Sequence, residues 1–280
     1  MIIDGRALAA DVLACTKARV ATLQRSPRIL ALVANETPAT KSYLAIKSKR
    51  AADAGCVLEV RHIKSSLRPY DIIDMSKDMD AVIVQLPLPS DMDTKTILNS
   101  IPIEKDADIL SSASRSKFEM KGLRNLSLLP PVVGAVRKIF EFGNVEVAGK
   151  KVVVIGDGWL VGKPAATWLA QQGAEVSFLT SKSGDLTAAL RAADIIVSGA
   201  GSPHLIKPEM LKQGVVLIDA GTSESGGAIA GDTDPACADK CSIFTPVPGG
   251  VGPLAVACLF ENVVTLAERR HKLFFFMRSI

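Results

Sequence analysis

The stretch GKKVVVIGDGWLVGKPAATWLAQQGAEVSFLTSKS, residues 149–183, decides the fold of this chain. Residues 151–155 are mostly apolar and rich in valine, as expected of a strand buried on both faces of a parallel sheet. A glycine-rich turn follows, then residues 165–172 with a helical composition, and then a second apolar run at 174–179. This order predicts the strand, phosphate-binding turn, helix and strand of a dinucleotide-binding unit.

The spacing of the three glycines in this turn also fits a plain connection between a strand and a helix. It is G-x-G-x-x-x-G at residues 156–162, rather than the usual G-x-G-x-x-G. Two further apolar runs, 193–198 and 215–220, favour nucleotide binding because each ends at small or glycine residues. Parallel strands that end in this way form the edge of an open sheet where ligands bind. We therefore predict a Rossmann-like, doubly wound parallel sheet.

Composition limits the class of protein. The chain has 280 residues, of which 48% are apolar, which suits two domains. A net charge of +4 without a basic tail favours small anionic ligands over nucleic acid, and we expect no membrane-spanning run and no signal peptide. Five cysteines without a C-x-x-C pair predict reduced thiols in a cytoplasmic protein, and three scattered histidines predict no metal site.

The front half of the chain predicts a second α/β layer. Its apolar runs read as strands, its periodic segments read as helices, and it has no glycine-rich phosphate turn. We expect this layer to hold the other substrate. The predicted helices are 5–24 and 37–54, and the predicted strands are 29–34, 57–63 and 80–85.

Two later segments determine how the domains are divided. Residues 102–127 are polar and poorly periodic, which predicts a long surface loop, and residues 253–270 predict an amphipathic helix that returns to the first domain. The expected first domain is therefore 1–143 with 254–280, and the expected dinucleotide-binding domain is 144–253.

Several polar side chains are candidates for chemistry. Tyr43 and Lys47 lie four apart on one face of a predicted helix, where a lysine could move a proton and a ring could stack on a flat substrate, although a solvated pair has the same spacing. Gln85 ends a buried strand directly before the Leu-Pro-Leu-Pro run at 86–89, where a neutral amide has few structural reasons to be. Asp106 and Asp108 are typical turn-forming carboxylates.

Five motifs together resemble the methylenetetrahydrofolate dehydrogenase/cyclohydrolase family in order and spacing, over nearly the whole chain. They are YLAIK (43–47), VQLPLP (84–89), KDAD (105–108), VGKP (161–164) and TPVPGGVGP (245–253). The resemblance implies two α/β domains flanking a cleft, with tetrahydrofolate between them and NADP on the second domain, usually in a homodimer. It implies hydride transfer from methylenetetrahydrofolate to a nicotinamide and hydrolysis of the product to 10-formyltetrahydrofolate, in one-carbon metabolism that serves purine biosynthesis.

The resemblance also assigns roles to residues. Lys47 would be the catalytic lysine, Tyr43 would stack on the aminobenzoate of the folate, Gln85 would hydrogen-bond near the reacting nitrogens and tune Lys47, and Asp108 would hold the amino edge of the pterin. A neutral lysine would tolerate the cationic methenyl carbon better than an ammonium. Pro248, Gly249 and Gly250 would border the folate, and the cofactor would lie against Gly156, Asp157, Gly158, Gly162, Ser181, Lys182 and Thr222.

Three departures from the family pattern keep alternatives open. Ile109 stands where the family has glycine, PPVVGA (130–135) lacks a usual threonine and proline, and Asp157 replaces an arginine that helps to neutralise the adenosine 2′-phosphate. Ser181 and Lys182 could still hold that phosphate, so NADP is favoured slightly over NAD. The alternatives to the bifunctional enzyme are a dehydrogenase alone and an inactive folate- or nucleotide-binding paralogue.

Overall fold

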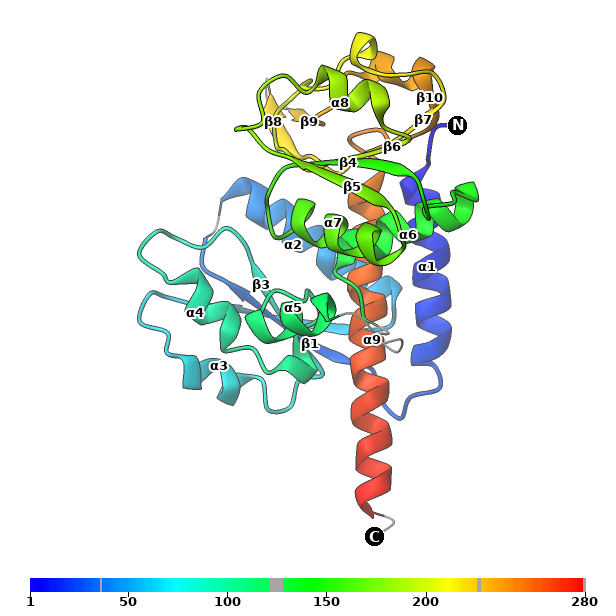
Figure 1. Cartoon of the computed structure of the whole chain (residues 1–280). Coiled ribbons are helices and arrows are strands. Elements are labelled where there is room, and N and C mark those ends of the chain that lie inside the picture. Colours follow the sequence, from blue (N-terminus) through cyan, green and yellow to red (C-terminus); the bar gives the residue numbers. More distant parts are fainter. Residues whose placement is uncertain (36, 121–127, 226–227, 279–280) are drawn as a thin grey trace. The chain divides into compact units, whose positions relative to one another are not determined.

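The computed structural model of the protein describes residues 1–35, 37–120, 128–225 and 228–278. The chain forms two compact units, each built on a parallel sheet (Figure 1). We call Met1–Ala9 with Val132–Ala255 the five-strand unit, and Ala10–Pro131 with Val256–Ile280 the three-strand unit. The predicted domain limits, at 143–144 and 253–254, stay predictions.

The main sheet of the five-strand unit has the strand order β10-β7-β6-β4-β5, with all neighbours parallel. The doubly wound fold is confirmed, because the chain runs outward from β4 first to β5 and then, on the other side, to β6 and β7. The strand β10 and the hairpin of β8 and β9 were not predicted. The strands are β4 (Lys151–Ile155), β5 (Glu175–Leu179), β6 (Ile195–Ser198), β7 (Val215–Asp219), β8 (Ser223–Ser225), β9 (Ala228–Ala230) and β10 (Cys241–Phe244).

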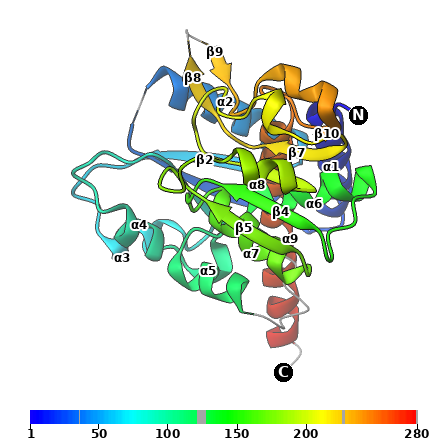
Figure 2. The same ribbon diagram turned by 45° about the horizontal axis from the view of Figure 1, so that its top comes forward.

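Helices cover both faces of this sheet, with α8 on one face and α6 and α7 on the other (Figures 1 and 2). The helix α7 buries Ala165, Trp168 and Leu169, which recur at the i, i+3 and i+4 spacing of a single helix face. The rings of Trp168 and Phe140 pack with centroids 6.1 Å apart. The helical segments are α6 (Pro131–Gly143), α7 (Gly162–Gln171), α8 (Thr187–Ala192), and the 3-10 turns η2 (Pro208–Met210) and η3 (Pro235–Lys240).

The three-strand unit has the strand order β2-β1-β3, again parallel throughout. The central strand carries the continuous apolar run RILALV, and every residue after Arg28 is buried. Its elements are β1 (Arg28–Val33), α2 (Pro38–Asp53), β2 (Val57–His62), α3 (Pro69–Met75), β3 (Ala81–Gln85), α4 (Thr94–Asn99), η1 (Ile103–Lys105) and α5 (Ser112–Glu119).

The long surface loop predicted for 102–127 is wrong over its described part, which holds η1 and α5. The sequence of α5, SASRSKFE, is mostly polar because only Ser114 and Phe118 are buried, so it shows no apolar periodicity. Its start depends on a local cap, in which the Ser111 hydroxyl accepts a hydrogen bond from the Ser114 amide at 3.2 Å. Residues 121–127 lie outside the described residues.

Two long helices, α1 (Gly5–Val20) and α9 (Val251–Arg278), each begin in the five-strand unit and end in the three-strand unit. In the latter, Arg19 of α1 pairs with Glu268 of α9 at 2.9 Å. The expectation that no stretch reaches membrane-spanning length is wrong, because Val251–Lys272 is long and apolar enough. A core helix of a soluble protein meets the same criterion, and 67% of the apolar window is buried inside the protein.

Candidate functional site

The candidate catalytic lysine meets the candidate glutamine at the carboxyl end of β3. Lys47 lies on α2, whose first turn is capped by the Thr37 hydroxyl accepting from the Thr40 amide at 3.1 Å. Lys47 Nζ donates to Gln85 Oε1 at 3.0 Å, and Gln85 Nε2 donates to the Leu86 carbonyl at 3.0 Å. Because the second bond fixes which end of the amide carries the oxygen, Gln85 presents an acceptor to the lysine.

The two carboxylates of KDAD have different roles. Asp106 is buried and accepts hydrogen bonds from the amides of Leu110 at 3.2 Å and Ser111 at 2.9 Å, which is the expected turn-forming behaviour. Asp108 keeps some exposure to solvent, yet desolvation raises the pKa of its carboxyl, while the positive charge of Lys47 acts in the opposite direction. The structure therefore brings Asp108, Lys47 and Gln85 into one site.

The loop that carries Asp108 is tightly held. Because the Asp106 carboxylate binds amides four and five residues ahead, the chain between them must curl, and Ile109 adopts a left-handed φ of 57° with only 6% of its surface exposed. From α9, Asn262 Nδ2 donates to the carbonyls of Ala107 at 2.9 Å and Leu129 at 2.8 Å. The sequence analysis missed Asn262, although a lone amide on the apolar face of a long helix is a usable signal.

Tyr43 lies one turn before Lys47 on α2, and 42% of its surface is exposed. The spacing argument placed the two side chains on the same helix face, and the ring is accessible to a ligand. Its stacking role stays a prediction.

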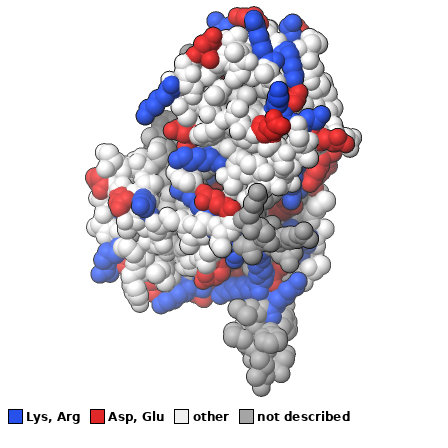
Figure 3. All heavy atoms as spheres, viewed as in Figure 1, with Lys and Arg blue, Asp and Glu red and all other residues white. Residues whose placement is uncertain are grey.

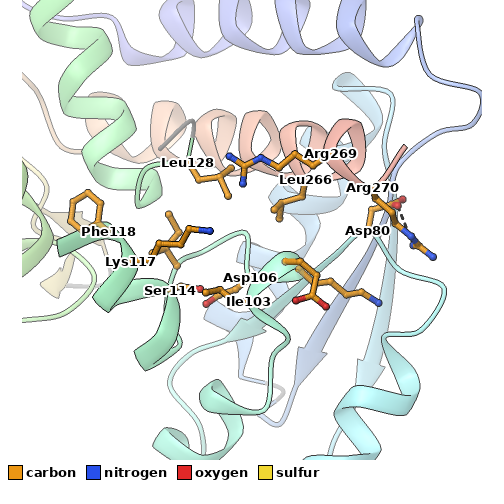
Figure 4. Close-up of a pocket in the computed structure, with 13 residues that line it drawn as sticks. Asp80, Ile103, Asp106, Ser114, Lys117, Phe118, Leu128, Leu266, Arg269 and Arg270 are labelled. Atoms are coloured by element: carbon orange, nitrogen blue, oxygen red, sulfur yellow. Dashed lines mark hydrogen bonds and ion pairs between the residues drawn. The ribbon is translucent and has the colours of Figure 1, made fainter. Parts of the chain in front are cut away.

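A separate cavity of about 420 Å³ lies between α5 and α9 in the three-strand unit (Figure 4). None of Tyr43, Lys47, Gln85 and Asp108 is among its lining residues, whereas Ile109 is. Leu128, the first described residue after the gap at 121–127, also lines the cavity. We therefore place the candidate site at the end of β3 and not in this cavity.

In the five-strand unit, the predicted cofactor residues come together at the carboxyl edge of the sheet. The glycine turn follows β4, Ser181 and Lys182 follow β5, and Thr222 follows β7. A Cβ at Gly162 would overlap the carbonyl oxygen of Gly156, so the turn folds back on itself where only glycine fits. The helix α7 starts there without a side-chain cap, but in its first turn the Lys163 amide donates to the Gly158 carbonyl at 3.1 Å and Pro164 has no N–H. An anion would therefore be bound by the amides of the glycine turn itself. These features fit a dinucleotide pyrophosphate.

The polar residues around this turn also carry charge. Asp157 is exposed in the turn, and Lys163 Nζ lies 4.2 Å from the centroid of the Trp159 ring. Ser181 and Lys182 are exposed in a turn where the Lys182 amide donates to the Thr180 hydroxyl at 3.2 Å. The turn after β5 thus presents a hydroxyl and a cation without a carboxylate.

The loop after β10 places the residues predicted to border the folate at the same edge of this sheet. The Gly250 amide donates to the Pro246 carbonyl at 2.7 Å, and Gly249 has a φ of 112°. Pro248 is exposed and Gly250 is buried. Their contact with a folate stays a prediction.

Two buried carboxylates of the five-strand unit, Asp219 and Asp232, were missed by the sequence analysis. Asp219 ends the otherwise apolar strand VVLID, which is the signal that could have singled it out. Burial raises the pKa of Asp219, hydrogen bonds from Thr233 oppose this shift, and the neighbouring Asp232 adds to it.

The described residues include no group of three or more histidine, cysteine, aspartate or glutamate side chains that could hold a metal ion. All five cysteines lie within the described residues, and no disulfide joins them. On the face shown in Figure 3, lysine and arginine are interspersed with aspartate and glutamate.

Comparisons with known proteins show the family of this chain. The family model of the tetrahydrofolate dehydrogenase/cyclohydrolase catalytic domain matches residues 3–108, and that of the NAD(P)-binding domain of the same family matches residues 130–271. The bifunctional protein FolD of Methanococcoides burtonii is 36% identical over 279 residues, which cover 96% of this chain and 96% of that protein.

Solved structures of methylenetetrahydrofolate dehydrogenase/cyclohydrolases superpose on this chain. The bifunctional FolD methylenetetrahydrofolate dehydrogenase/cyclohydrolase of Campylobacter jejuni superposes with a TM-score of 0.91 at 31% identity, covering 96% of this chain and 99% of that one. The Trypanosoma brucei enzyme, solved with NADP and an inhibitor, superposes with a TM-score of 0.90 at 32% identity, covering 96% and 98%. This chain belongs to the tetrahydrofolate dehydrogenase/cyclohydrolase family.

Proposed function

We propose that this protein is a bifunctional enzyme that oxidises methylenetetrahydrofolate to methenyltetrahydrofolate with NADP and hydrolyses the product to 10-formyltetrahydrofolate. The observation that carries the proposal is the hydrogen bond from Lys47 Nζ to Gln85 Oε1, next to Asp108, in a chain of this family. The full-length similarity to bifunctional relatives supports both activities.

The side chains suit the two steps. Gln85 orients Lys47 through its neutral amide oxygen. A water molecule adds to the cationic methenyl carbon and releases one proton. Lys47 Nζ can relay the second proton from that oxygen to the ring nitrogen as the bond from the carbon to this nitrogen breaks. Asp108 can accept hydrogen bonds from the amino edge of the pterin. Tyr43, one turn away, can cover the aminobenzoate ring.

The five-strand unit fits the oxidant of the first step. The backbone of the glycine turn at residues 156–162 would hold the pyrophosphate, and Ser181 and Lys182 would contact the 2′-phosphate. NADP, when bound, accepts the hydride from the methylene carbon.

A spectrophotometric assay tests the proposed function. Purified protein is mixed with methylenetetrahydrofolate and either NADP or NAD, and methenyl formation is followed until the cofactor is exhausted. We expect methenyl formation with NADP, followed by decay of the methenyl product faster than in buffer. Formation without accelerated decay would leave a dehydrogenase alone, and no formation by a folded protein would favour the non-catalytic binding paralogue.

Cofactor choice gives a sharper test at Asp157. Its exposed carboxylate stands in the nucleotide turn, where it would repel a 2′-phosphate. Replacing it with a cation removes this repulsion and adds an attraction, so Asp157→Arg should lower the KM for NADP by about three- to tenfold, since the replacement changes a pair interaction by roughly 1 kcal/mol. The KM for NAD is the control and should change less. Equal changes for both cofactors would mean that the phosphate is bound elsewhere.

We also propose a homodimer that works in the cytoplasm. β5 is an edge strand of its sheet and leaves Phe178 39% exposed, which suits pairing with a second copy of the chain. Five cysteines without a disulfide suit a reducing compartment. Activity recovered with the soluble cytoplasmic fraction of gently lysed cells would support the location, and recovery in another fraction would contradict it.

A further inference from the structure

The carboxylate of Asp232 connects three segments of the five-strand unit. It follows the hairpin of β8 and β9, is fully buried, and accepts hydrogen bonds from the hydroxyl of Ser198 at 2.7 Å and from the amides of Ala200 at 2.7 Å and Ser202 at 2.8 Å. Ser198 is the last residue of β6, so every one of these donors lies at the carboxyl end of that strand. One side chain thus sets the path of the chain immediately after β6.

A second carboxylate holds Asp232 in place. Asp219, the last residue of β7, accepts from the Thr233 amide at 2.8 Å and the Thr233 hydroxyl at 2.7 Å, and from the Gly221 amide at 2.9 Å. The packing is reciprocal, since a Cβ at Gly221 would overlap the Asp232 carboxylate and a Cβ at Gly231 would overlap that of Asp219. Each carboxylate accepts three hydrogen bonds, which is how a buried carboxylate is accommodated.

The segment held by Asp232 packs directly on the glycine turn. A Cβ at Gly156 would overlap the Gly199 carbonyl oxygen, and a Cβ at Gly199 would overlap the side chain of Val161, the residue before α7. A shift of residues 199–202 would therefore move the turn and the start of α7. The position of the glycine turn and of the start of α7 therefore depends on Asp232.

We propose that Asp232 is a positioning residue for the dinucleotide half of the reaction, through which the end of β6 and the glycine turn are kept in their binding geometry. The inference rests on the proposed use of NADP. Hydrolysis of methenyltetrahydrofolate consumes water and needs no oxidant, so it is an internal control, and a loss confined to the oxidation step separates Asp232 from a residue that only stabilises the fold.

The decisive variant is Asp232→Asn, which keeps the size of the side chain and changes one acceptor oxygen into a donor. Oδ2 faces the Ser198 hydroxyl and the Ala200 amide, and Oδ1 faces the Ser202 amide. In either orientation of the new amide, its NH2 group meets a backbone N–H, and one donor is left without an acceptor. The segment after β6 must shift to relieve this conflict.

The experiment measures the KM and kcat of the dehydrogenase, the affinity for NADP by calorimetry, and the hydrolysis of methenyltetrahydrofolate without cofactor. For Asp232→Asn we expect the KM and Kd for NADP to rise about tenfold, the effect of one unsatisfied buried donor. Hydrolysis and the KM for methylenetetrahydrofolate should stay within about twofold of wild type, a factor that corresponds to roughly 0.4 kcal/mol. Asp234→Asn is the matched control, since the Asp234 carboxylate caps the Ala236 amide at 2.9 Å at the start of η3, and it should leave all of these values unchanged.

An unchanged NADP affinity, or a parallel loss of hydrolysis, would overturn the inference. If Asp232→Asn does not fold, Thr233→Val removes one of the two hydrogen bonds between Thr233 and Asp219 and should raise the KM for NADP by a smaller factor with hydrolysis retained. A wild-type protein that reduces neither NADP nor NAD would refute the proposed function instead, so the two failures are distinguishable.

Discussion

Lys47 depends on neighbours that are far from it in the sequence. Gln85 fixes its amino group from the end of β3, and Asp108 approaches from a loop whose shape is set by Asp106 and Asn262. Because Gln85 is itself hydrogen-bonded and the loop of Asp108 is held by Asp106 and Asn262, the lysine is held in a defined geometry, as expected of a residue that transfers protons.

Substitution of this lysine tests its role. Lys47→Met keeps an unbranched chain of similar length but removes the amino group, so hydrolysis of methenyltetrahydrofolate should fall by about 10²–10⁴-fold. Binding of NADP should be unchanged by calorimetry, because the cofactor residues lie in the other unit. Lys49→Met, at an exposed position of the same helix, is the control. Hydrolysis at the wild-type rate would remove Lys47 from the mechanism.

Ile109 gives a prediction about stability. A left-handed φ costs a side-chain-bearing residue about 1–2 kcal/mol, and glycine is free of this cost. Ile109→Ala should therefore lower the free energy of unfolding by about 2–4 kcal/mol through lost burial, and Ile109→Gly should be about 1 kcal/mol less destabilising than the alanine variant.

Urea denaturation measures the free energy of unfolding of both Ile109 variants. Ile97 is the matched control, because it is also 6% exposed but lies within the helix α4. There the order should reverse, with glycine about 1 kcal/mol worse than alanine. The same order at both positions would contradict a strained backbone at Ile109.

At the scale of elements, the glycine turn between β4 and α7 has positions with different structural demands. A Cβ at Gly162 would overlap backbone, whereas a Cβ at Gly158 would have no atom within 4 Å. Gly162 is required by the fold, and Gly158 is free to face a ligand. The sequence pattern showed both as equal members of one motif.

This difference gives a paired prediction. Gly162→Ala should lower the melting temperature and weaken NADP binding together, because the turn must open to admit the methyl group. Gly158→Ala should leave stability within about 0.5 kcal/mol of wild type yet weaken NADP binding, since the pyrophosphate approaches the backbone there. Thermal denaturation and calorimetry measure the two effects. Unchanged binding in Gly158→Ala would place the pyrophosphate elsewhere in the turn.

For the whole molecule, the open edge of β5 is the feature that bears on assembly. Among the described residues this strand pairs with β4 alone, and its sequence EVSFL has none of the prolines or lysines that commonly protect an edge. The exposed Phe178 adds an apolar side chain to the unpaired backbone groups. A second copy of the chain would cover both.

Sedimentation tests the proposed dimer, whose mass would be twice the 29.6 kDa of one chain. Phe178→Asp should weaken association by at least about tenfold, because it places a charge at a buried apolar contact. Phe142→Asp, at a phenylalanine of α6 that is 56% exposed, is the control and should remain dimeric. Dissociation by Phe142→Asp alone would place the interface at α6, and a monomeric wild type would contradict the dimer.

The sequence by itself determined those features whose physical cause is local. The apolar runs of β1, β4, β6 and β7, of which the last three are mainly β-branched, and the glycine turn predict buried parallel strands and a nucleotide-binding edge. The motifs YLAIK, VQLPLP and KDAD identified Lys47, Gln85 and Asp108 as candidates through the family resemblance.

Only the tertiary structure decided which of these side chains meet and what holds them. The Lys47–Gln85 hydrogen bond, the separate tasks of Asp106 and Asp108, and the linked carboxylates of Asp219 and Asp232 join residues from different elements. Such contacts leave no periodic trace, because periodicity records which face of an element is buried and not which partner covers it. The helix α5 was missed because its polar sequence buries only two side chains and therefore shows no apolar periodicity.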